Sequence, residues 1–193
     1  MQSSTNAGFR LPRHVVPRAY AIDLTTTPRR RRFSGKVAID VELLEPADAI
    51  VLHARDLKLR DAVARVGRRR LPARVRYQRD RETASLHFDS PLRRGAARLE
   101  IAFEGRLDPR MHGLYLARSG DEVAIASQCE AADARAIFPC FDEPDRKATF
   151  AWTVRTDPGL VVITNGVPKS ARRDPASGLV VHRFAPTPVL STY

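Results

Sequence analysis

Gln128 and Glu130 are the residues of this 193-residue chain whose types and spacing could bind a ligand. They stand two apart at the end of a predicted strand, so both side chains point to one face. A carboxylate beside an amide suits a primary ammonium group, because the carboxylate accepts a charge-assisted hydrogen bond and the amide oxygen is a second acceptor. A solvent-exposed strand end explains the same spacing, and spacing alone favours that second interpretation.

The pair begins a segment, residues 127–150, that is rich in charged and aromatic side chains. Polar residues between apolar anchors are typical of a functional loop on a rigid scaffold. We expect its acids and bases to form ion pairs and helix-end contacts, and its phenylalanines and prolines to anchor and stiffen it. These structural roles are assigned to Asp133, Arg135, Asp142, Glu143, Asp145, Arg146 and Lys147, to Phe138, Phe141 and Phe150, and to Pro139 and Pro144.

The sequence lacks the motifs of the common catalytic and cofactor sites. It contains no His-Glu-x-x-His, no Gly-x-Ser-x-Gly, no phosphate-binding loop and no dinucleotide fingerprint. The five histidines, at positions 14, 53, 87, 112 and 182, are scattered, and His53 and His87 have the apolar neighbours of structural residues. We therefore expect neither a catalytic residue nor a metal site in this chain.

The two cysteines, Cys129 and Cys140, both lie in the 127–150 segment. Their spacing matches no zinc pattern. A disulfide is possible in principle, but two buried reduced thiols are the favoured interpretation for a cytosolic chain.

The chain is strongly basic, with 33 Lys and Arg against 22 Asp and Glu and a net charge of +11. Such a charge can mark a nucleic-acid surface. No aromatic-interleaved binding motif accompanies it, and the arginine runs at 29–32 and 68–70 fall between strand-like segments. We interpret them as solvated turns and expect no nucleic-acid partner.

Apolar residues recur with a period of two. Val37, Ile39, Val41 and Leu43 alternate with polar residues, as do Tyr20, Ile22 and Leu24 before the 28–32 turn, which predicts a hairpin. Further strands are expected at 49–53, 57–59, 74–77, 84–88, 99–103, 122–127, 148–155, 160–164 and 179–184. The predicted fold is all-β, a multi-sheet β-sandwich-like domain with one short helix at 131–137, stopped by Pro139.

The chain is expected to form one domain over residues 11–193, after a disordered lead-in at 1–10. No apolar run could span a bilayer, and the N-terminus lacks the apolar region of a secretory signal. A cytoplasmic location without membrane contact is therefore expected, although a signal removed beforehand would leave no trace. Residues 187–193 begin an apolar segment without a turn or polar tail, which predicts a fragment of a longer protein.

Residues 127–150 resemble the signature at the end of the N-terminal domain of the M1 family of zinc aminopeptidases, which includes aminopeptidase N, the puromycin-sensitive enzyme and leukotriene A4 hydrolase. The matching residues are Ser127, Gln128, Glu130, Ala134, Arg135, Phe138, Pro139, Cys140, Asp142, Pro144, Lys147, Ala148 and Phe150. Further matches, in order along the chain, are Leu11-Pro12, residues 16–24, 33–37 and 52–57, Gly113-Leu114-Tyr115, Thr164-Asn165-Gly166 and residues 187–193.

This resemblance implies that Gln128 and Glu130 bind the free α-amino group of a peptide substrate, which reverses the interpretation from spacing alone. It implies zinc in a longer parent protein, whose zinc helix and Gly-x-Met-x-Asn loop lie beyond this domain. The chain alone is then expected to bind no zinc and to be inactive, with the catalytic domain of the same polypeptide as its partner.

Two alternatives remain open at this point. Some relatives of that family are non-catalytic scaffolds, although a scaffold has no need of an amine-binding pair. A free-standing β-sandwich binding module would require residue 193 to be the true end of the protein. Epoxide hydrolysis, which one branch of the family performs, also stays open.

Overall fold

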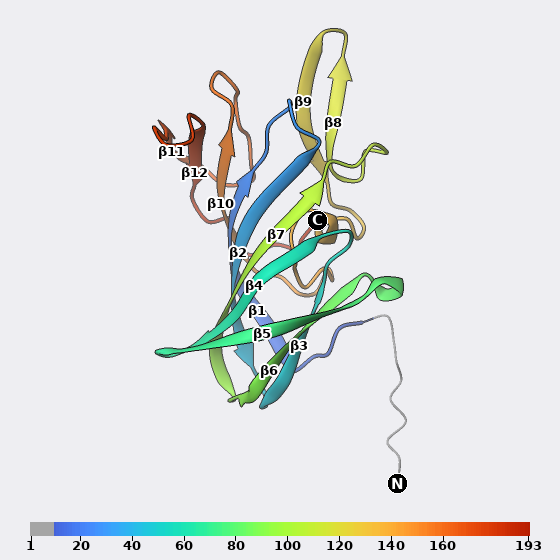
Figure 1. Cartoon of the computed structure of the whole chain (residues 1–193), viewed down its shortest axis with the longest axis vertical. Coiled ribbons are helices and arrows are strands. Elements are labelled where there is room, and N and C mark those ends of the chain that lie inside the picture. Colours follow the sequence, from blue (N-terminus) through green and yellow to red (C-terminus); the bar gives the residue numbers. More distant parts are fainter. Residues whose placement is uncertain (1–9) are drawn as a thin grey trace.

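Twelve strands and two single-turn 3-10 helices form the described part, residues 10–193, of this computed structural model (Figure 1). Of the predicted lead-in at 1–10, residues 1–9 lie outside the described residues. The strands are β1 Val15–Thr25, β2 Arg32–Leu43, β3 Ala47–His53, β4 Lys58–Val66, β5 Arg69–Gln78, β6 Thr83–Leu92, β7 Gly95–Arg106, β8 Gly113–Ser119, β9 Glu122–Gln128, β10 Thr149–Thr156, β11 Pro168–Arg173 and β12 Val180–Phe184. The 3-10 helices are η1 Arg79–Arg81 and η2 Ala134–Ala136. The predicted all-β class is confirmed.

The strands form one large sheet and one small sheet. The ten-stranded sheet has the order β11-β12-β10-β1-β2-β7-β4-β5-β6-β3, and β8 and β9 pair separately as a hairpin. The pairing of β1 with β10 is parallel. Figure 1 shows β5 crossing β1, β2 and β7 at a steep angle, with β3 and β6 at one end of the molecule and the β8–β9 hairpin projecting from the opposite end.

The two parts of the large sheet enclose a common core. Leu52 and Leu86, from β3 and β6, belong to the same buried cluster as Ile39 and Leu99, from β2 and β7. All four side chains are fully buried, with 0% of their surface exposed. The β-sandwich-like arrangement expected from the sequence therefore arises from one bent sheet, in which the part with β3 and β6 packs against the part with β2 and β7.

Alternating burial explains why β1 and β2 form. The apolar residues Val37, Ile39, Val41 and Leu43 are at most 2% exposed, and the intervening positions face outward. β1 and β2 pair antiparallel along almost their whole length, which confirms the predicted hairpin. The apolar face of each strand supplies the driving force, because burial of a Val, Leu or Ile side chain contributes roughly 1.5–3 kcal/mol.

Two phenylalanines lie over two glycines across the β2–β7 pair. The register places Phe33 opposite Gly105 and Gly35 opposite Phe103. A Cβ atom on Gly35 would lie 2.5 Å from Phe103 Cζ and 2.6 Å from the carbonyl oxygen of Asp23. The Phe-x-Gly spacing of the sequence is thus a packing requirement, in which each ring occupies the space that the opposite glycine leaves free.

Some predicted elements differ from the observed ones. Residues 160–164 are not a strand, because no neighbouring strand pairs with them within residues 10–193. The helix predicted at 131–137 is reduced to η2, with backbone bonds that span three residues, such as Ile137 N to Ala134 O at 2.9 Å. β8 and β11 were not predicted, since neither has a clean alternation of buried and exposed residues.

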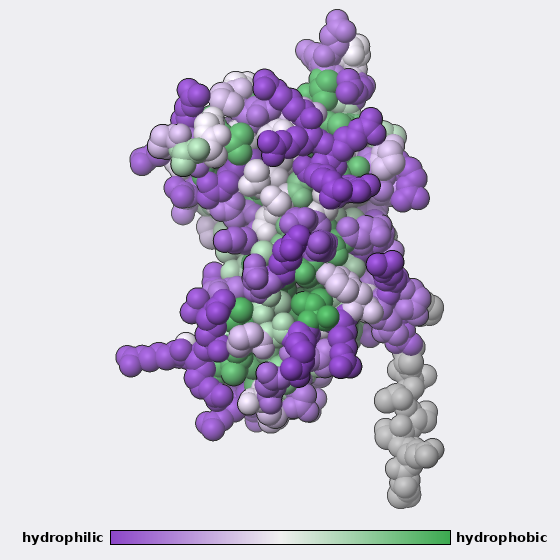
Figure 2. Space-filling view, viewed as in Figure 1, coloured by the Kyte–Doolittle hydropathy of each residue, from purple (hydrophilic) through white to green (hydrophobic). Residues whose placement is uncertain are grey.

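The arginine-rich turn at 68–70 is solvated, as predicted. It lies at the β4–β5 connection, where these three residues are exposed and Arg69 and Arg70 already begin β5. Hydrophilic side chains cover most of the face in Figure 2, including the projecting β4–β5 tip. No helix in the described residues is long and apolar enough to cross a bilayer.

We predict that Gly35→Ala destabilises the fold by about 1–3 kcal/mol, because overpacking a filled site forces neighbouring groups to shift. The free energy of unfolding, measured by urea denaturation, tests this. Ser34→Ala is the matched control, since Ser34 is exposed on the same strand and its change should stay within about 0.5 kcal/mol. Equal stability of Gly35→Ala and the unchanged chain would contradict the packing role of this glycine.

Candidate functional site

Gln128 and Glu130 lie on the surface at the C-terminal end of β9. Gln128 is the last residue of the strand, opposite Gly113 of β8, and Glu130 follows in the next turn. Both residues are exposed, whereas Cys129 between them is partly buried against the core. That the two side chains share a face stays a prediction, because Glu130 lies beyond the end of the strand. The peptide bond between Glu130 and Ala131 is cis.

Neither candidate side chain has a hydrogen-bonding or ion-pair partner among residues 10–193. The other four acids of the 127–150 segment are all ion-paired with an arginine or histidine. These paired acids are Asp133, Asp142, Glu143 and Asp145. Within the described part of the chain, Glu130 is therefore the acid of this segment whose charge is left available.

Asp133 holds the turn that follows Glu130. Its backbone N–H donates to the carbonyl of Cys129 at 2.9 Å, and its carboxylate accepts hydrogen bonds from Arg55 and from His112 Nδ1, the latter at 3.0 Å. Burial by itself would raise the pKa of Asp133, but these hydrogen bonds outweigh it and lower the pKa. Asp133 is thus a charged anchor for the turn.

Glu82 and Asp142 extend this arrangement into a network of alternating charges. Glu82 accepts hydrogen bonds from Arg55 at 3.5 Å and from Arg135 at 3.2 Å. Arg135 Nε donates to Asp142 Oδ2 at 2.9 Å, and the Thr192 hydroxyl donates to Asp142 Oδ1 at 2.6 Å. The Asp142 side chain has no exposed surface, so these partners compensate a fully buried charge.

His53 has a structural role, as predicted. At the end of β3 it exchanges two backbone hydrogen bonds with Cys140, and its Nδ1 accepts the backbone N–H of Asp142 at 3.2 Å. Burial, assisted by the positive charge of Arg135, lowers the pKa of His53 to about 4. The imidazole is therefore neutral at physiological pH and serves as a hydrogen-bond acceptor.

A second ion-pair group ties the start of the chain to the same segment. Glu143 accepts the backbone N–H of Leu11 at 2.7 Å, and Arg146 donates to the carbonyl of Pro12 at 2.7 Å. Asp145 pairs with Arg10 and Arg13 at 3.2 and 2.6 Å. The predicted ion pairs are thereby confirmed except for Lys147, which is exposed and has no ion pair in residues 10–193.

The aromatic anchors of the segment are buried as predicted. Phe138, Phe141 and Phe150 are at most 4% exposed. Tyr20 stacks on Phe150 with ring centroids 4.8 Å apart, and its hydroxyl accepts the backbone N–H of Phe141 at 3.1 Å. The segment is therefore fixed to β1 on one side and, through His53, to β3 on the other.

Cys129 and Cys140 are free thiols, as the favoured interpretation expected, but only Cys140 is fully buried, whereas Cys129 is half-buried. Burial raises the pKa of Cys129 to about 12 and that of Cys140 well above its ordinary value. Both remain protonated at neutral pH, which suits packing and not nucleophilic chemistry. Within residues 10–193, no three His, Cys, Asp or Glu side chains come together in a way that could hold a metal ion.

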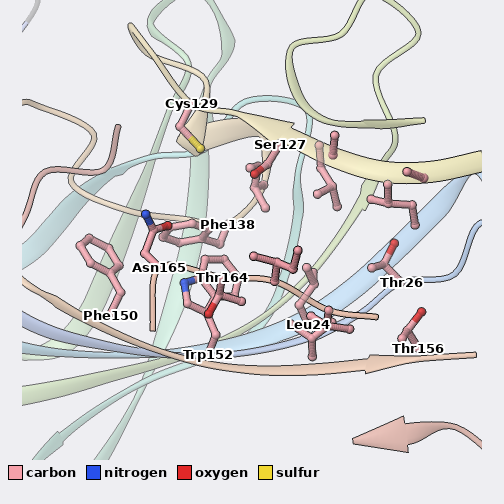
Figure 3. A pocket seen from close by; sticks show the side chains of 18 of the residues that line it. Leu24, Thr26, Ser127, Cys129, Phe138, Phe150, Trp152, Thr156, Thr164 and Asn165 are labelled. Carbon is pink, nitrogen blue, oxygen red and sulfur yellow. The ribbon is translucent and has the colours of Figure 1, made fainter. Parts of the chain in front are cut away.

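A pocket of about 450 Å³, lined mostly by apolar side chains, lies beside β9 (Figure 3). Ser127 and Cys129 line it, together with Trp152 of β10, but Gln128 and Glu130 do not. β9 therefore borders the pocket along residues 123–127, whereas the exposed amide and carboxylate lie outside its lining.

Sequence reasoning missed four members of the charge network: Arg55, Glu82, His112 and Thr192. Arg55 and Glu82 lie 78 and 53 residues from their partners Asp133 and Arg135, and Thr192 lies 50 residues from Asp142. No local pattern marks such residues, because their partners are set by the folding of distant segments. The matches at 52–57 and 187–193 were the signals that pointed to two of these regions.

Comparisons with known proteins give one consistent result. The family model described as the Peptidase M1 N-terminal domain matches residues 16–193. The chain is 32% identical to "Aminopeptidase N" of Acetobacter pasteurianus over 99% of its length, and 33% identical to "Aminopeptidase M1" of Arabidopsis thaliana over 95%. It is 34% identical to "Probable M1 family aminopeptidase 2" of Encephalitozoon cuniculi (strain GB-M1), again over 95%. The chain spans 54%, 22% and 21% of these three relatives.

We predict that Arg135→Met destabilises the chain by about 3–5 kcal/mol, because it leaves the buried carboxylate of Asp142 without its charged partner. Unfolding by urea, or the yield of folded protein if the variant does not fold, measures the effect. The double variant Arg135→Met with Asp142→Asn should recover much of the loss, since position 142 then carries no buried charge that needs a partner. Lys147→Ala is the exposed control. A double variant as unstable as the single one would exclude the charge explanation.

The low pKa of His53 also predicts a pH-dependent stability. At pH values between the ordinary pKa of 6.5 and the folded-state pKa of about 4, His53 binds a proton in the unfolded chain but not in the folded chain. The contribution of His53 to the free energy of unfolding is therefore fully present above pH 6.5. The free energy of unfolding falls by roughly 2–3 kcal/mol as the pH drops through that window. His53→Asn keeps an acceptor without titrating, so this loss should disappear, whereas His87→Asn, on the neighbouring β6, should preserve it. Urea denaturation at pH 7, 5.5 and 4.5 measures all three proteins, and identical pH profiles would contradict the assignment.

Proposed function

The chain belongs to the peptidase M1 family, whose N-terminal domain it matches over residues 16–193, and we propose that it is the substrate-anchoring domain of an aminopeptidase. In this proposal, Glu130 and Gln128 bind the α-amino group of a peptide. The similarity to proteins named aminopeptidases supports the activity of the longer protein. The free carboxylate of Glu130, in a segment where the other four acids are paired, is the observation that carries the residue assignment.

The chemistry of the pair suits a protonated amine. A carboxylate on an otherwise unpaired side chain can accept a charge-assisted hydrogen bond from an ammonium group without breaking an existing ion pair. The amide oxygen of Gln128 supplies a second acceptor from the same face of the strand. An amino group bound there would fix the position of the peptide relative to the catalytic groups, so that the bond after its first residue is the one that is cleaved.

The turn after β9 is suited to keep Glu130 in place. The backbone bond from Asp133 to Cys129 closes the turn, and Asp133 is itself held by Arg55 and His112. A recognition residue on a fixed turn loses less conformational freedom on binding, which favours affinity. The charge network thus supports the amine site without contacting the amine.

Zinc belongs to this proposal as a cofactor of the longer protein. The described residues bring together no set of side chains that could hold it, so we propose that its ligands lie in a catalytic domain outside this chain. When bound there, zinc would polarise the scissile carbonyl and activate a water molecule. The part played by this chain is to bind and orient the amino end of the peptide, and the chain alone is proposed to be inactive.

In the longer protein, we predict that Glu130→Ala lowers kcat/KM for a peptide with a free amino terminus by about 2–4 kcal/mol of transition-state stabilisation. Steady-state kinetics with an aminoacyl reporter substrate measures this. Gln128→Ala should cause a smaller loss, because it removes a neutral acceptor. The matched control is Glu122→Ala, at the exposed opposite end of β9.

The substrate provides an independent readout. Acetylation of the peptide amino group should abolish the difference between Glu130→Ala and the unchanged protein, since no ammonium group then remains to be bound. Near-normal kinetics of Glu130→Ala with the free peptide would sink the assignment of the site. A longer protein without any peptidase activity would instead favour the scaffold alternative.

A further inference from the structure

A second pocket, of about 1100 Å³, lies at the end of the large sheet where β2 and β4 begin and β7 ends. Seven Lys and Arg side chains line it, against four Asp and Glu. Its volume is close to the upper end of the range that is usual for small-molecule sites, about 300–1,000 Å³. We call it the basic pocket.

The acids of the basic pocket compensate few of its cations. Three of the four acids, Glu82, Glu104 and Asp108, are ion-paired, and Asp56 is the one without a partner among residues 10–193. Two of the seven cations, Arg55 and Arg110, are also paired. The other five have neither an ion pair nor a side-chain hydrogen bond within residues 10–193. These free cations are Arg31, Arg32, Lys58, Arg79 and Arg106.

The pairing of β2 with β7 holds two of the free cations together. Arg32, the first residue of β2, lies directly opposite Arg106, the last residue of β7. The backbone N–H of Leu107 donates to the carbonyl of Arg31 at 2.9 Å, so the pairing continues to Arg31. Directly opposite residues have their Cβ atoms roughly 4.5–5.5 Å apart, and like charges there are destabilising. The fold therefore keeps two arginines side by side without an anion of the chain to separate them.

A third free cation lies on the next strand. Lys58, the first residue of β4, is opposite Glu104 of β7. Glu104 instead forms its ion pair with Arg60, at 3.1 Å. Lys58, Arg32 and Arg106 are all exposed and each is next to a buried residue of its chain segment, so they share the outward face of three neighbouring strands. Positive charge is thus concentrated at one edge of the pocket.

Tyr77 adds a neutral donor to the same pocket. Its side chain lines the pocket and is 45% exposed. The hydroxyl oxygen accepts the backbone N–H of Leu59 at 2.6 Å, which fixes its position. The hydroxyl proton is not used in that bond and can be donated to an acceptor in the pocket.

We propose that the basic pocket binds a small anion that carries two or more adjacent phosphate groups. A phosphate group carries about two negative charges at neutral pH and several acceptor oxygens, and guanidinium groups bind it through two parallel hydrogen bonds. A single phosphate compensates only part of the charge of five free cations. The site is built only from residues of this chain, so it is independent of the proposed function.

The lining favours a small anion over a strand of nucleic acid. Proteins that bind single strands combine a basic groove with several aromatic side chains on which the bases stack. Among residues 10–193, Tyr77 is the only Phe, Tyr or Trp in the lining of the basic pocket. The cations surround a hollow of limited volume, which suits a compact ligand.

The basic pocket adjoins the charge network of the turn after β9. Arg55 and His112 line the pocket, and both bind the carboxylate of Asp133. Asp133 is buried, so the loss of these partners would leave an uncompensated charge. We therefore assign the ligand to the five free cations, which can bind an anion without breaking an ion pair of that network.

Isothermal titration of the chain with inorganic tripolyphosphate, at about 0.15 M salt, tests the proposal. Tripolyphosphate should bind at one site, at least about tenfold more tightly than inorganic phosphate. Citrate, which carries three carboxylates, and a single-stranded oligonucleotide are the competing anions. Equal or tighter binding of either would overturn the proposal, as would the lack of saturable tripolyphosphate binding below about 1 mM. The same titration of the longer protein should give the same result, and a loss of binding there would also overturn the proposal.

A pair of arginine variants locates the site. Arg106→Gln should weaken tripolyphosphate binding about ten- to a hundredfold, because it removes a charged donor. Arg94→Gln is the matched control, since Arg94 is exposed, has no ion pair in residues 10–193 and lies outside the pocket lining. Equal losses with both variants would show that only the net charge matters and would refute the site.

The stability of the ligand-free variant separates a binding role from a structural one. Without ligand, Arg106→Gln should unfold at the same or a higher urea concentration than the unchanged chain, because it removes the repulsion from Arg32. Added tripolyphosphate should then stabilise the unchanged chain more than the variant. A variant that is less stable without ligand and is stabilised equally by tripolyphosphate would contradict the assignment.

Discussion

The buried carboxylate of Asp142 is the constraint on which the rest of this structure depends. A charge without exposed surface is tolerated only when it is paired and hydrogen-bonded. Arg135 of η2 and Thr192 near residue 193 bind this carboxylate, and His53 at the end of β3 accepts the backbone N–H of Asp142. Through these contacts Asp142 couples the turn after β9 to the bent sheet.

The same network explains why Glu130 stands apart. Arg55, Glu82 and Arg135 form a chain of alternating charges that leads from Asp133 to Asp142. Asp133 and Asp142 are therefore already paired with arginines. A free carboxylate on the rim of such a loop costs little because it is solvated, and it remains available to a cationic group. Paired acids and one unpaired acid thus follow one another along the chain, and their surroundings decide which of them form ion pairs.

β9 also borders a pocket of the protein. Residues 123–127 and Cys129 line this pocket, most of whose lining side chains are apolar, whereas Gln128 and Glu130 are exposed and lie outside the lining. The strand and the residues that follow it thus pack against the rest of the protein and still leave the amide and the carboxylate accessible to solvent.

The sequence by itself determined what depends on local pattern. The alternation in residues 20–24 and 37–43 predicted β1, β2 and their hairpin, and the phenylalanines of the loop predicted its anchors. Only the tertiary structure decided which charges meet, since Arg55, Glu82, His112 and Thr192 are distant in sequence from the groups they bind. It also decided the state of residues 160–164, whose pattern is that of a strand but which have no neighbour to pair with among the described residues. The physical reason is that the alternation of apolar and polar residues can be read from the local sequence. A paired strand or an ion pair, in contrast, forms only when folding brings a second, distant segment beside the first.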